Sequence, residues 1–246
     1  MVNVIIVTQA RIGSSRLPGK VLKKINGKSI LEIHLERIKK SKYGKKLILA
    51  TTNEEGVDGI IEIAKNLNVK YYQGNTDDVL DRFFQAAVDF DPDYVVRLTS
   101  DCPLIDPTLM DDIIEFAIRK KTDYTTNTLI EQYPDGQDVE VIKWTALKEA
   151  WKNSKIKFQR EHVTPYIREN SSFFGIKKFT SINFCSEHDY GNVRMTVDEL
   201  ADFESIKVLI DNLGFNSDWL SYTNFIIDNP NLFKNQQIIR NQGSNT

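Results

Sequence analysis

Short apolar runs alternate with longer amphipathic segments along the first half of the chain. The runs predict strands at residues 4–7, 46–51, 69–72 and 94–98, and the first of them is wholly β-branched, as buried strands often are. The segments between them repeat apolar residues every three or four positions, which predicts helices near residues 30–38, 57–67 and 79–87. This alternation predicts an α/β fold with a mostly parallel, doubly wound sheet.

The pattern loosens from about residue 123 onward. Further strands are predicted at residues 123–127, 139–142 and 193–198, and further helices at 145–151 and 199–213. A chain of 246 residues suits one domain, so we expect residues 1–246 to form a single unit with a small lobe at about 123–190. Ligands of such sheets bind at the carboxyl ends of the strands, so polar residues that directly follow a strand are the first candidates.

Charge and cysteine content argue against several kinds of partner. The chain has 32 Lys and Arg against 34 Asp and Glu, whereas binding to nucleic acid or to an anionic membrane favours a basic excess. Cys102 and Cys185 lack the spacing of a zinc site or a disulfide scaffold, which favours a reducing, cytoplasmic setting. No apolar run approaches the ~20 residues of a membrane span. We expect a cytoplasmic protein without a nucleic-acid or membrane partner.

The stretch after the first strand is rich in small and basic residues. Residues 8–20 contain two glycines, two serines, Arg11, Arg16 and Lys20, and no acidic residue. Small residues allow backbone N–H groups to turn inward and bind anions, and a mixture of Arg and Lys suits a polyphosphate. A solvated basic loop after an edge strand would have the same composition. Neither a Walker A element nor a G-x-G-x-x-G motif is present.

Two aspartates follow predicted strands. Asp101 comes after the run at 94–98, and Asp198 ends the run at 193–198. Carboxylates together with phosphate oxygens are the ligands that Mg²⁺ prefers. Capping of the next helix is the competing role for Asp101, but Asp106 before Pro107 fits that role better. We expect Asp101 and Asp198 to bind one Mg²⁺ from adjacent strands.

The sequence A-R-I-G-S-S-R-L-P-G-K at residues 10–20 resembles the signature loop of nucleotidyltransferases that make CMP-sugars. It is most similar to the cytidylyltransferase family named after spore-coat polysaccharide biosynthesis, a relative of the CMP-sugar acid synthetases. Other segments that resemble family motifs lie at residues 77–83, 101–103, 133–141, 161–167 and 197–202. At 199–201 this chain has Glu-Leu-Ala where relatives often have Thr-Pro-Glu, but both flanking aspartates are kept.

The resemblance implies a fold and an activity. The fold would be the nucleotidyltransferase variant of the glycosyltransferase A-type, Rossmann-like fold. The enzyme would depend on Mg²⁺, transfer CMP from CTP to a small sugar or anionic acceptor and release pyrophosphate, as a step in surface glycan biosynthesis. The acceptor would be a sugar acid or a phosphorylated or phosphonate compound. The lobe at 123–190 would meet the acceptor and the partner subunit of a homodimer.

The resemblance and the residue patterns together assign site residues of four kinds. Arg16, Lys20, Asp101 and Asp198 are the expected catalytic residues, and Asp101 and Asp198 are the metal ligands. The expected nucleotide-binding residues are Ala10, Arg11, Gly13, Ser14, Ser15, Arg16, Lys20, Thr52, Asn53, Asp81, Arg82 and Thr99. The expected acceptor-binding residues are Asp135, Gln137, Glu161 and His162. An acidic acceptor would need a further arginine, for which Arg160 and Arg168 are the candidates.

Two other functional classes remain open at this stage. A glycosyltransferase with a nucleotide-sugar donor would be expected to carry Asp-x-Asp after a strand, and residues 101–103 read Asp-Cys-Pro. A non-catalytic nucleotide-binding protein would not need two metal carboxylates. Among the remaining polar residues, His34 lies on an apolar helical stripe, so we expect a packed core histidine, and Cys102 is expected to pack rather than react.

Overall fold

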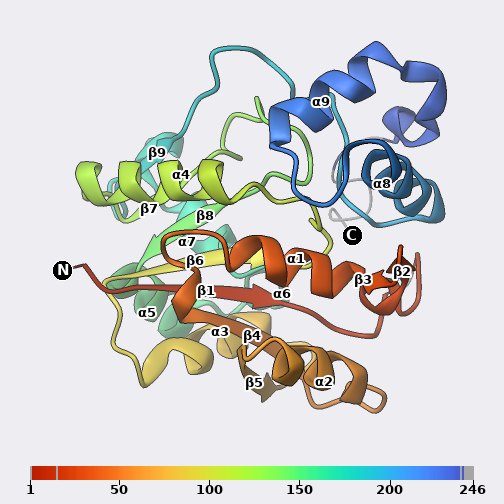
Figure 1. The fold of residues 1–246 in the computed structure, drawn as a ribbon. Coiled ribbons are helices and arrows are strands. Elements are labelled where there is room, and N and C mark those ends of the chain that lie inside the picture. Colours follow the sequence, from red (N-terminus) through yellow and green to blue (C-terminus); the bar gives the residue numbers. More distant parts are fainter. Residues whose placement is uncertain (1, 15, 239, 241–246) are drawn as a thin grey trace.

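A computed structural model describes residues 2–14, 16–238 and 240 of the chain. In this part of the chain, seven strands form one sheet in the order β5-β4-β1-β6-β8-β7-β9 (Figure 1). The strands are β1 (Val4–Gln9), β4 (Leu47–Thr52), β5 (Lys70–Gly74), β6 (Tyr94–Thr99), β7 (Tyr124–Thr126), β8 (Glu140–Lys143) and β9 (Ser181–Asn183). Only β8 runs antiparallel to its neighbours, so the expectation of a mostly parallel α/β sheet is confirmed.

Helices cover both faces of the sheet because its central strands are apolar on both sides. Ile6 of β1 packs on the face that carries α1 (Ile30–Ile38), α2 (Asp58–Asn66) and α4 (Pro107–Lys120). Ile5 and Val7 pack on the opposite face, under α3 (Val79–Val88) and α5 (Trp144–Asn153). Successive side chains of a strand point to opposite faces, which is why one short run supplies both cores.

The remaining elements are short or lie beside the sheet. α8 (Leu200–Leu213) and α9 (Trp219–Asp228) form a third core with the α1 residues Ile30 and Ile33. The short elements are the hairpin β2 (Lys24–Ile25) and β3 (Lys28–Ser29) and the helices α6 (Lys157–His162) and α7 (Pro165–Glu169). The part of the chain that the structure describes also has five short 3₁₀ helices, at Lys20–Leu22, Gly44–Lys46, Ser172–Phe174, Pro230–Leu232 and Lys234–Gln237. Among the described residues, no helix is long and apolar enough to cross a membrane.

The predicted strand at residues 193–198 is wrong. This segment forms a single bridge, between Arg194 and Asp135, because β1 and β8 already occupy both edges of β6. It crosses the end of the sheet instead, where the Val197 N–H donates to the Asp101 carbonyl at 2.8 Å. Gly136 permits the crossing, since its φ is 112° and a Cβ atom there would lie 2.7 Å from the Met195 carbonyl carbon.

His162 and Tyr166 are four positions apart, the spacing of one helical face, but they do not share a helix. α6 ends at His162 and α7 begins at Pro165. Between them Val163 has φ 71° and ψ −57°, and the Thr164 N–H donates to the His162 carbonyl at 2.8 Å. That is a γ-turn, a strained conformation for a β-branched residue. The buried Val163 side chain packs in the core under α5 and so stabilises the turn.

His34 is a packed core histidine, as expected. Its ring is fully buried, with Nδ1 2.8 Å from the Cys102 carbonyl and Nε2 2.8 Å from the Thr8 hydroxyl. Because a carbonyl only accepts, Nδ1 donates and Nε2 accepts from Thr8. Burial lowers the pKa of His34 to about 4. The neutral ring therefore ties α1 to β1 and to the segment that follows Asp101.

The buried histidine predicts a loss of stability in mild acid. Unfolded His34 binds a proton near pH 6.5, whereas folded His34 does so only near pH 4. Stability is thus fully present above pH 6.5 and falls as the pH drops toward 4, by about 3 kcal/mol from this residue. Urea unfolding of the wild type and His34→Gln across this range measures the effect. Parallel pH profiles for the two proteins would contradict the assignment.

Candidate active site

Two adjoining cavities open at the carboxyl ends of β1 and β6. The loop cavity, of about 380 Å³, is lined by the basic stretch after β1 and by the start of α3. The lobe cavity, of about 550 Å³, is lined by residues between 128 and 168 together with the ends of β1 and β6 and residues of the segment 194–198. A common wall separates them, formed by Gln9, Arg16, Arg97, Thr99, Asp101, His162 and Asp198. A ligand in either cavity would therefore face the same two aspartates.

Backbone amides of the basic loop already hold one carboxylate. The Ile12 and Gly13 N–H groups donate to Oε1 of Glu54 at 3.0 and 3.4 Å. Burial opposes the charge of Glu54, but a hydrogen bond from Thr52 and those from these two amides lower its pKa. Arg11 lies nearby and is exposed. Part of the loop thus binds an anionic group, as its small residues predict.

Lys20 connects Asp101 and Asp198. Its Nζ lies 2.8 Å from Oδ1 of Asp198, 3.4 Å from Oδ2 of Asp101 and 2.7 Å from the Val197 carbonyl oxygen. Burial disfavours the charge on Asp101, yet the Lys20 ammonium and hydrogen bonds lower its pKa to about 2. The two carboxylates therefore converge on one point although they lie 97 positions apart in the sequence.

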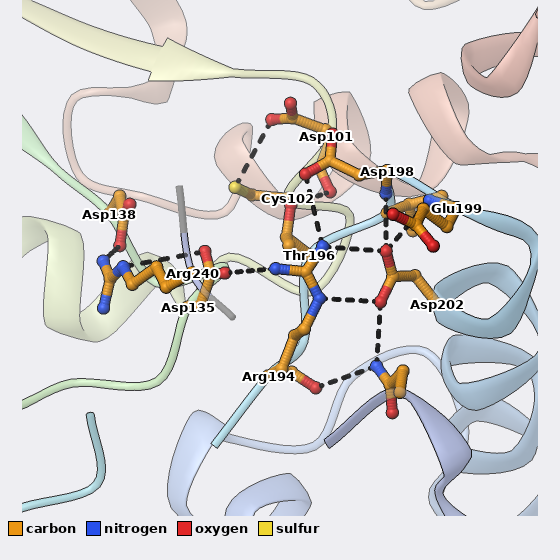
Figure 2. Close-up of polar contacts among 12 residues, drawn as sticks. Asp101, Cys102, Asp135, Asp138, Arg194, Thr196, Asp198, Glu199, Asp202 and Arg240 are labelled. Carbon is orange, nitrogen blue, oxygen red and sulfur yellow. Dashed lines mark hydrogen bonds and ion pairs between the residues drawn. The ribbon is translucent and has the colours of Figure 1, made fainter. Parts of the chain in front are cut away.

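Arg194 and Asp202 fix the position of Asp198 through hydrogen bonds to its side chain and its backbone (Figure 2). Asp202 is fully buried and accepts from the Arg194 Nε at 2.8 Å and from the Asp198 N–H at 2.9 Å. Arg194 also contacts Asp198 Oδ2 at 3.3 Å and Asp135 Oδ2 at 2.7 Å. This network replaces the missing strand as the support of Asp198.

The oxygen donors around Lys20 suit a divalent cation. Two carboxylates and the Val197 carbonyl surround the position of the ammonium, and hard oxygens of this kind are the ligands of Mg²⁺. Within the described residues, no group of three or more His, Cys, Asp or Glu is arranged to hold a metal. A cation bound at Asp101 and Asp198 would therefore depend on ligand phosphates and water for its other contacts, and it would compete with Lys20.

Most predicted nucleotide-binding residues lie together. Those that line the loop cavity are Ala10, Arg11, Gly13, Ser14, Arg16, Lys20 and Arg82, and Thr99 belongs to the common wall. Three others do not line it. Thr52 is fully buried and Asn53 is exposed, whereas Asp81 accepts from the Trp151 ring N–H at 2.8 Å and supports helix packing. Ser15 lies outside the described residues.

The four predicted acceptor-binding residues do not all line the same cavity. Asp135 lines the lobe cavity, Glu161 lines the loop cavity, and His162 lines both. Gln137 reaches neither: it is fully buried, accepts from the Asp106 N–H and donates to the Leu104 carbonyl, both at 2.9 Å. Its position thus contradicts an acceptor contact, because its amide clamps the chain after Asp101.

Several cavity residues escape the sequence patterns. Arg97 of β6 is in the common wall and forms an ion pair with Glu140 of β8. A charged residue inside the apolar run at 94–98 is the signal that marks it. Glu131, Asp138 and Arg240 also line the lobe cavity, but they become neighbours only through tertiary contacts and carry no local signal.

Known proteins resemble this chain over most of its length. Residues 4–218 match the family model described as cytidylyltransferase. An uncharacterized protein of Methanocaldococcus jannaschii is 38% identical over 229 residues, 92% of this chain and 91% of that protein. The spore coat polysaccharide biosynthesis protein SpsF of Bacillus subtilis is 31% identical over 223 residues, covering 89% of this chain and 90% of that protein. A cytidylyltransferase structure from Leptospira borgpetersenii has a TM-score of 0.90 at 31% identity, covering 97% of this chain and 100% of that one.

The sheet, the site and these similarities define an enzyme of the nucleotidyltransferase class. The chain belongs to the cytidylyltransferase family, and its mostly parallel sheet is the nucleotidyltransferase fold that the sequence predicts.

The buried Arg194–Asp202 pair predicts a stability defect. Asp202→Asn removes one of the three carboxylates that Arg194 contacts and weakens the hydrogen bonds from its buried guanidinium, so we expect the free energy of unfolding to fall by about 1–3 kcal/mol. Urea unfolding measures this loss. Asp211→Asn on the same helix is the matched control, because Asp211 pairs at the surface with Lys207 and should change stability little. Equal stabilities of the two variants would contradict the role of Asp202.

Proposed function

We propose that this enzyme transfers CMP from CTP to a small acceptor in a Mg²⁺-dependent reaction that releases pyrophosphate. The observation that carries the proposal is the common wall: Asp101 and Asp198 line both the loop cavity and the lobe cavity. A nucleotide in one cavity and an acceptor in the other would present the α-phosphorus and the attacking oxygen to the same carboxylates. Such positioning, with charge stabilisation, is what phosphoryl-type transfer requires of a protein.

The basic loop cavity is suited to a triphosphate. Arg11, Arg16 and Lys20 line it, and their charges together with loop amides would bind the phosphates. Release of Lys20 from Asp101 and Asp198 would let its ammonium reach the departing pyrophosphate. Glu54 would then exchange its two amide contacts for water or solvent cations as phosphate oxygens take its place.

Arg82 supports cytosine as the base. Its side chain is buried, lines the loop cavity and uses Nη1 to donate to the carbonyls of Asn75 and Thr76 at 2.5 and 2.8 Å. Arginine only donates, and its Nη2 has no hydrogen bond to another described residue. Cytosine offers two adjacent acceptors, O2 and N3, whereas uracil carries a donor at N3. A donor-only partner therefore favours CTP over UTP.

The metal would be held by Asp101 and Asp198. Bound there with the nucleotide, Mg²⁺ would polarise the α-phosphate and offset its developing charge. The protein's own part is to hold both aspartates together at the boundary between the cavities, with Lys20 against Asp101 and Asp198 before the metal binds and Arg194 against Asp198.

The lobe cavity would hold the acceptor, with Asp135 and His162 on its wall. We propose a sugar acid or a phosphorylated or phosphonate compound as the acceptor class. Similarity to the spore coat polysaccharide protein supports a role in surface glycan synthesis. We further propose that the enzyme works in the cytoplasm as a homodimer, with residues 123–190 as the acceptor and dimerisation lobe.

Nucleotide binding can be tested without knowing the acceptor. At ~100 times its dissociation constant, CTP with Mg²⁺ should stabilise the folded state by about 2.7 kcal/mol. For a chain of this size the melting temperature should rise by roughly 5–10 °C. UTP, ATP and GTP at the same concentration are the controls. An equal rise with UTP would contradict the role of Arg82, and no rise with any nucleotide would contradict the proposed function.

The metal assignment predicts a selective loss of turnover. Asp101→Asn removes a cation ligand without removing volume, so pyrophosphate release should fall at least ~100-fold. Its melting temperature should change little, because Lys20 keeps Asp198 as a partner. Asp112→Asn at an exposed position is the control. Unchanged turnover in Asp101→Asn would refute the metal site.

A further inference from the structure

Most side chains of the common wall already have polar partners in the protein. Ion pairs or hydrogen bonds to other side chains engage Arg16, Arg97, Thr99, Asp101 and Asp198. The other two wall residues, Gln9 and His162, have no hydrogen bond or ion pair between their side chains and any described residue. The His162 ring packs against Phe158, with 4.6 Å between the ring centroids. The side-chain amide of Gln9 lacks a comparable contact and is the least explained group of the wall.

The sheet fixes the direction of Gln9. It is the last residue of β1, and it pairs with Ala50 of β4 on one side and with Thr99 of β6 on the other. Ile5 and Val7 pack in the core under α3, so the side chain of Gln9, two positions further on, points to the same face of the sheet. Gln9 therefore reaches the boundary between the two cavities from a backbone that is held on both sides.

The amide of Gln9 is not satisfied by the described part of the chain. Its Oε1 is buried and accepts no hydrogen bond there, and its Nε2 donates none. A buried polar group without a partner is unfavourable, so the protein alone does not account for this residue. The terminal amide can turn about its last torsion, which lets either end face a ligand. Gln9 can thus offer a donor and an acceptor side by side.

Arg97 is the protein group that could satisfy this amide. Its Nε is also buried and donates to no described residue, and it lies on the same face of the sheet, two residues before Thr99 on β6. The two groups do not pair, although one donates and the other accepts. The guanidinium of Arg97 pairs instead with Glu140 of β8, on the side of β6 that faces away from β1. The acceptor of Gln9 therefore stays available to a ligand.

A nucleotide would bring a pair of hydroxyl groups to this position. In the proposed complex the base lies at Arg82 and the α-phosphate lies at Asp101 and Asp198. The ribose joins the two, so it must lie along the loop cavity beside the common wall, which contains Gln9. The 2′- and 3′-hydroxyls are adjacent, and each can donate and accept. One can donate to Oε1 while the other accepts from Nε2, which satisfies both ends of the amide.

Hydroxyl groups of the acceptor are the other possible source, because Gln9 also lines the lobe cavity. That cavity, however, has further carboxylates that accept from hydroxyls, at Glu131, Asp135 and Asp138. The side chains of the basic loop offer a ribose mainly donors. The ribose therefore has more need of the Gln9 acceptor than a ligand of the lobe cavity has.

We propose that Gln9 is a specificity-determining residue that binds the two ribose hydroxyls and so selects ribonucleotides over deoxyribonucleotides. This inference rests on the proposed function and adds to it a role for the sugar of the nucleotide. When a hydroxyl is missing, one end of the amide stays buried without a partner, and a site built to bind a hydroxyl rejects a ligand that lacks it. We expect 2′-deoxy-CTP and 3′-deoxy-CTP each to bind at least ~10-fold more weakly than CTP.

Isothermal titration calorimetry of the full chain with Mg²⁺ and these three nucleotides tests the inference. Gln9→Met removes the amide and keeps the length of the side chain. In this variant the affinity for CTP should fall at least ~10-fold, and the three affinities should agree within about twofold. Gln73→Met on the edge strand β5 is the matched control, because Gln73 donates to the Thr52 carbonyl and lines neither cavity. It should keep the ratios of the wild type.

The melting temperature of Gln9→Met without nucleotide is the second measurement. It should equal or exceed that of the wild type, because the substitution removes a buried amide that has no partner. A lower melting temperature would assign the amide to a structural contact, such as one with Arg97, and would overturn the inference. Equal affinities of the wild type for all three nucleotides would assign Gln9 to the ligand of the lobe cavity and overturn it as well.

Unchanged ratios in Gln9→Met would place the recognition of ribose on another residue and would also overturn the inference. A wild type that binds no CTP would instead contradict the proposed function. The two failures are therefore distinguishable, because the inference is judged by ratios between nucleotides and the proposed function by the binding of CTP itself.

Discussion

The site depends on the meeting of two carboxylates at the carboxyl end of β6. Asp101 and Asp198 would repel each other in a partly buried place, and the Lys20 ammonium between them makes their approach favourable. Arg194 and Arg16 compensate the outer side of Asp198. Charges of opposite sign therefore assemble the site before any ligand is bound, and a cation that replaces Lys20 would inherit a finished pair of ligands.

Asp101 and Asp198 must be held in place for this pair to form, and different contacts hold each of them. Asp198 lies on an irregular segment, which has no ladder of strand hydrogen bonds to hold it. Asp202 substitutes for that ladder by accepting from the Asp198 and Glu199 N–H groups and from Arg194. Asp101 is held differently, since it follows a central strand and precedes a segment fixed by His34 and Gln137. One aspartate is placed by the sheet, and the other by a buried ion pair.

The two cavities on either side of these aspartates have different linings. The loop cavity collects cations and amides from the first turn of the fold, whereas the lobe cavity collects residues from β8, α6, α7 and the crossing segment. The γ-turn at Val163 permits this, because it redirects the chain so that His162 and Arg168 both reach the lobe cavity. A continuous helix could not place residues six positions apart on one face.

Local sequence determined the parts of this protein that depend on neighbouring residues. Periodicity identified the parallel sheet, its covering helices and the buried His34, and the composition of residues 8–20 identified the anion-binding loop. It also marked Asp101, because a residue that follows a strand has a defined place in a doubly wound sheet. The motifs of the family then connected these parts to a cytidylyltransferase.

Only the tertiary structure decided the rest. Residues 193–198 alternate apolar and polar side chains like a strand, but β6 had no edge left for them to pair with. Gln137 is a polar residue in a family motif, yet it serves as a buried clamp. Arg160 and Arg168 are equivalent by composition. In the structure Arg160 donates to the carboxylate of Asp78, which lies 82 positions away, whereas Arg168 lines the lobe cavity. Pairing partners and free strand edges are set by contacts between distant segments, and no local pattern encodes them.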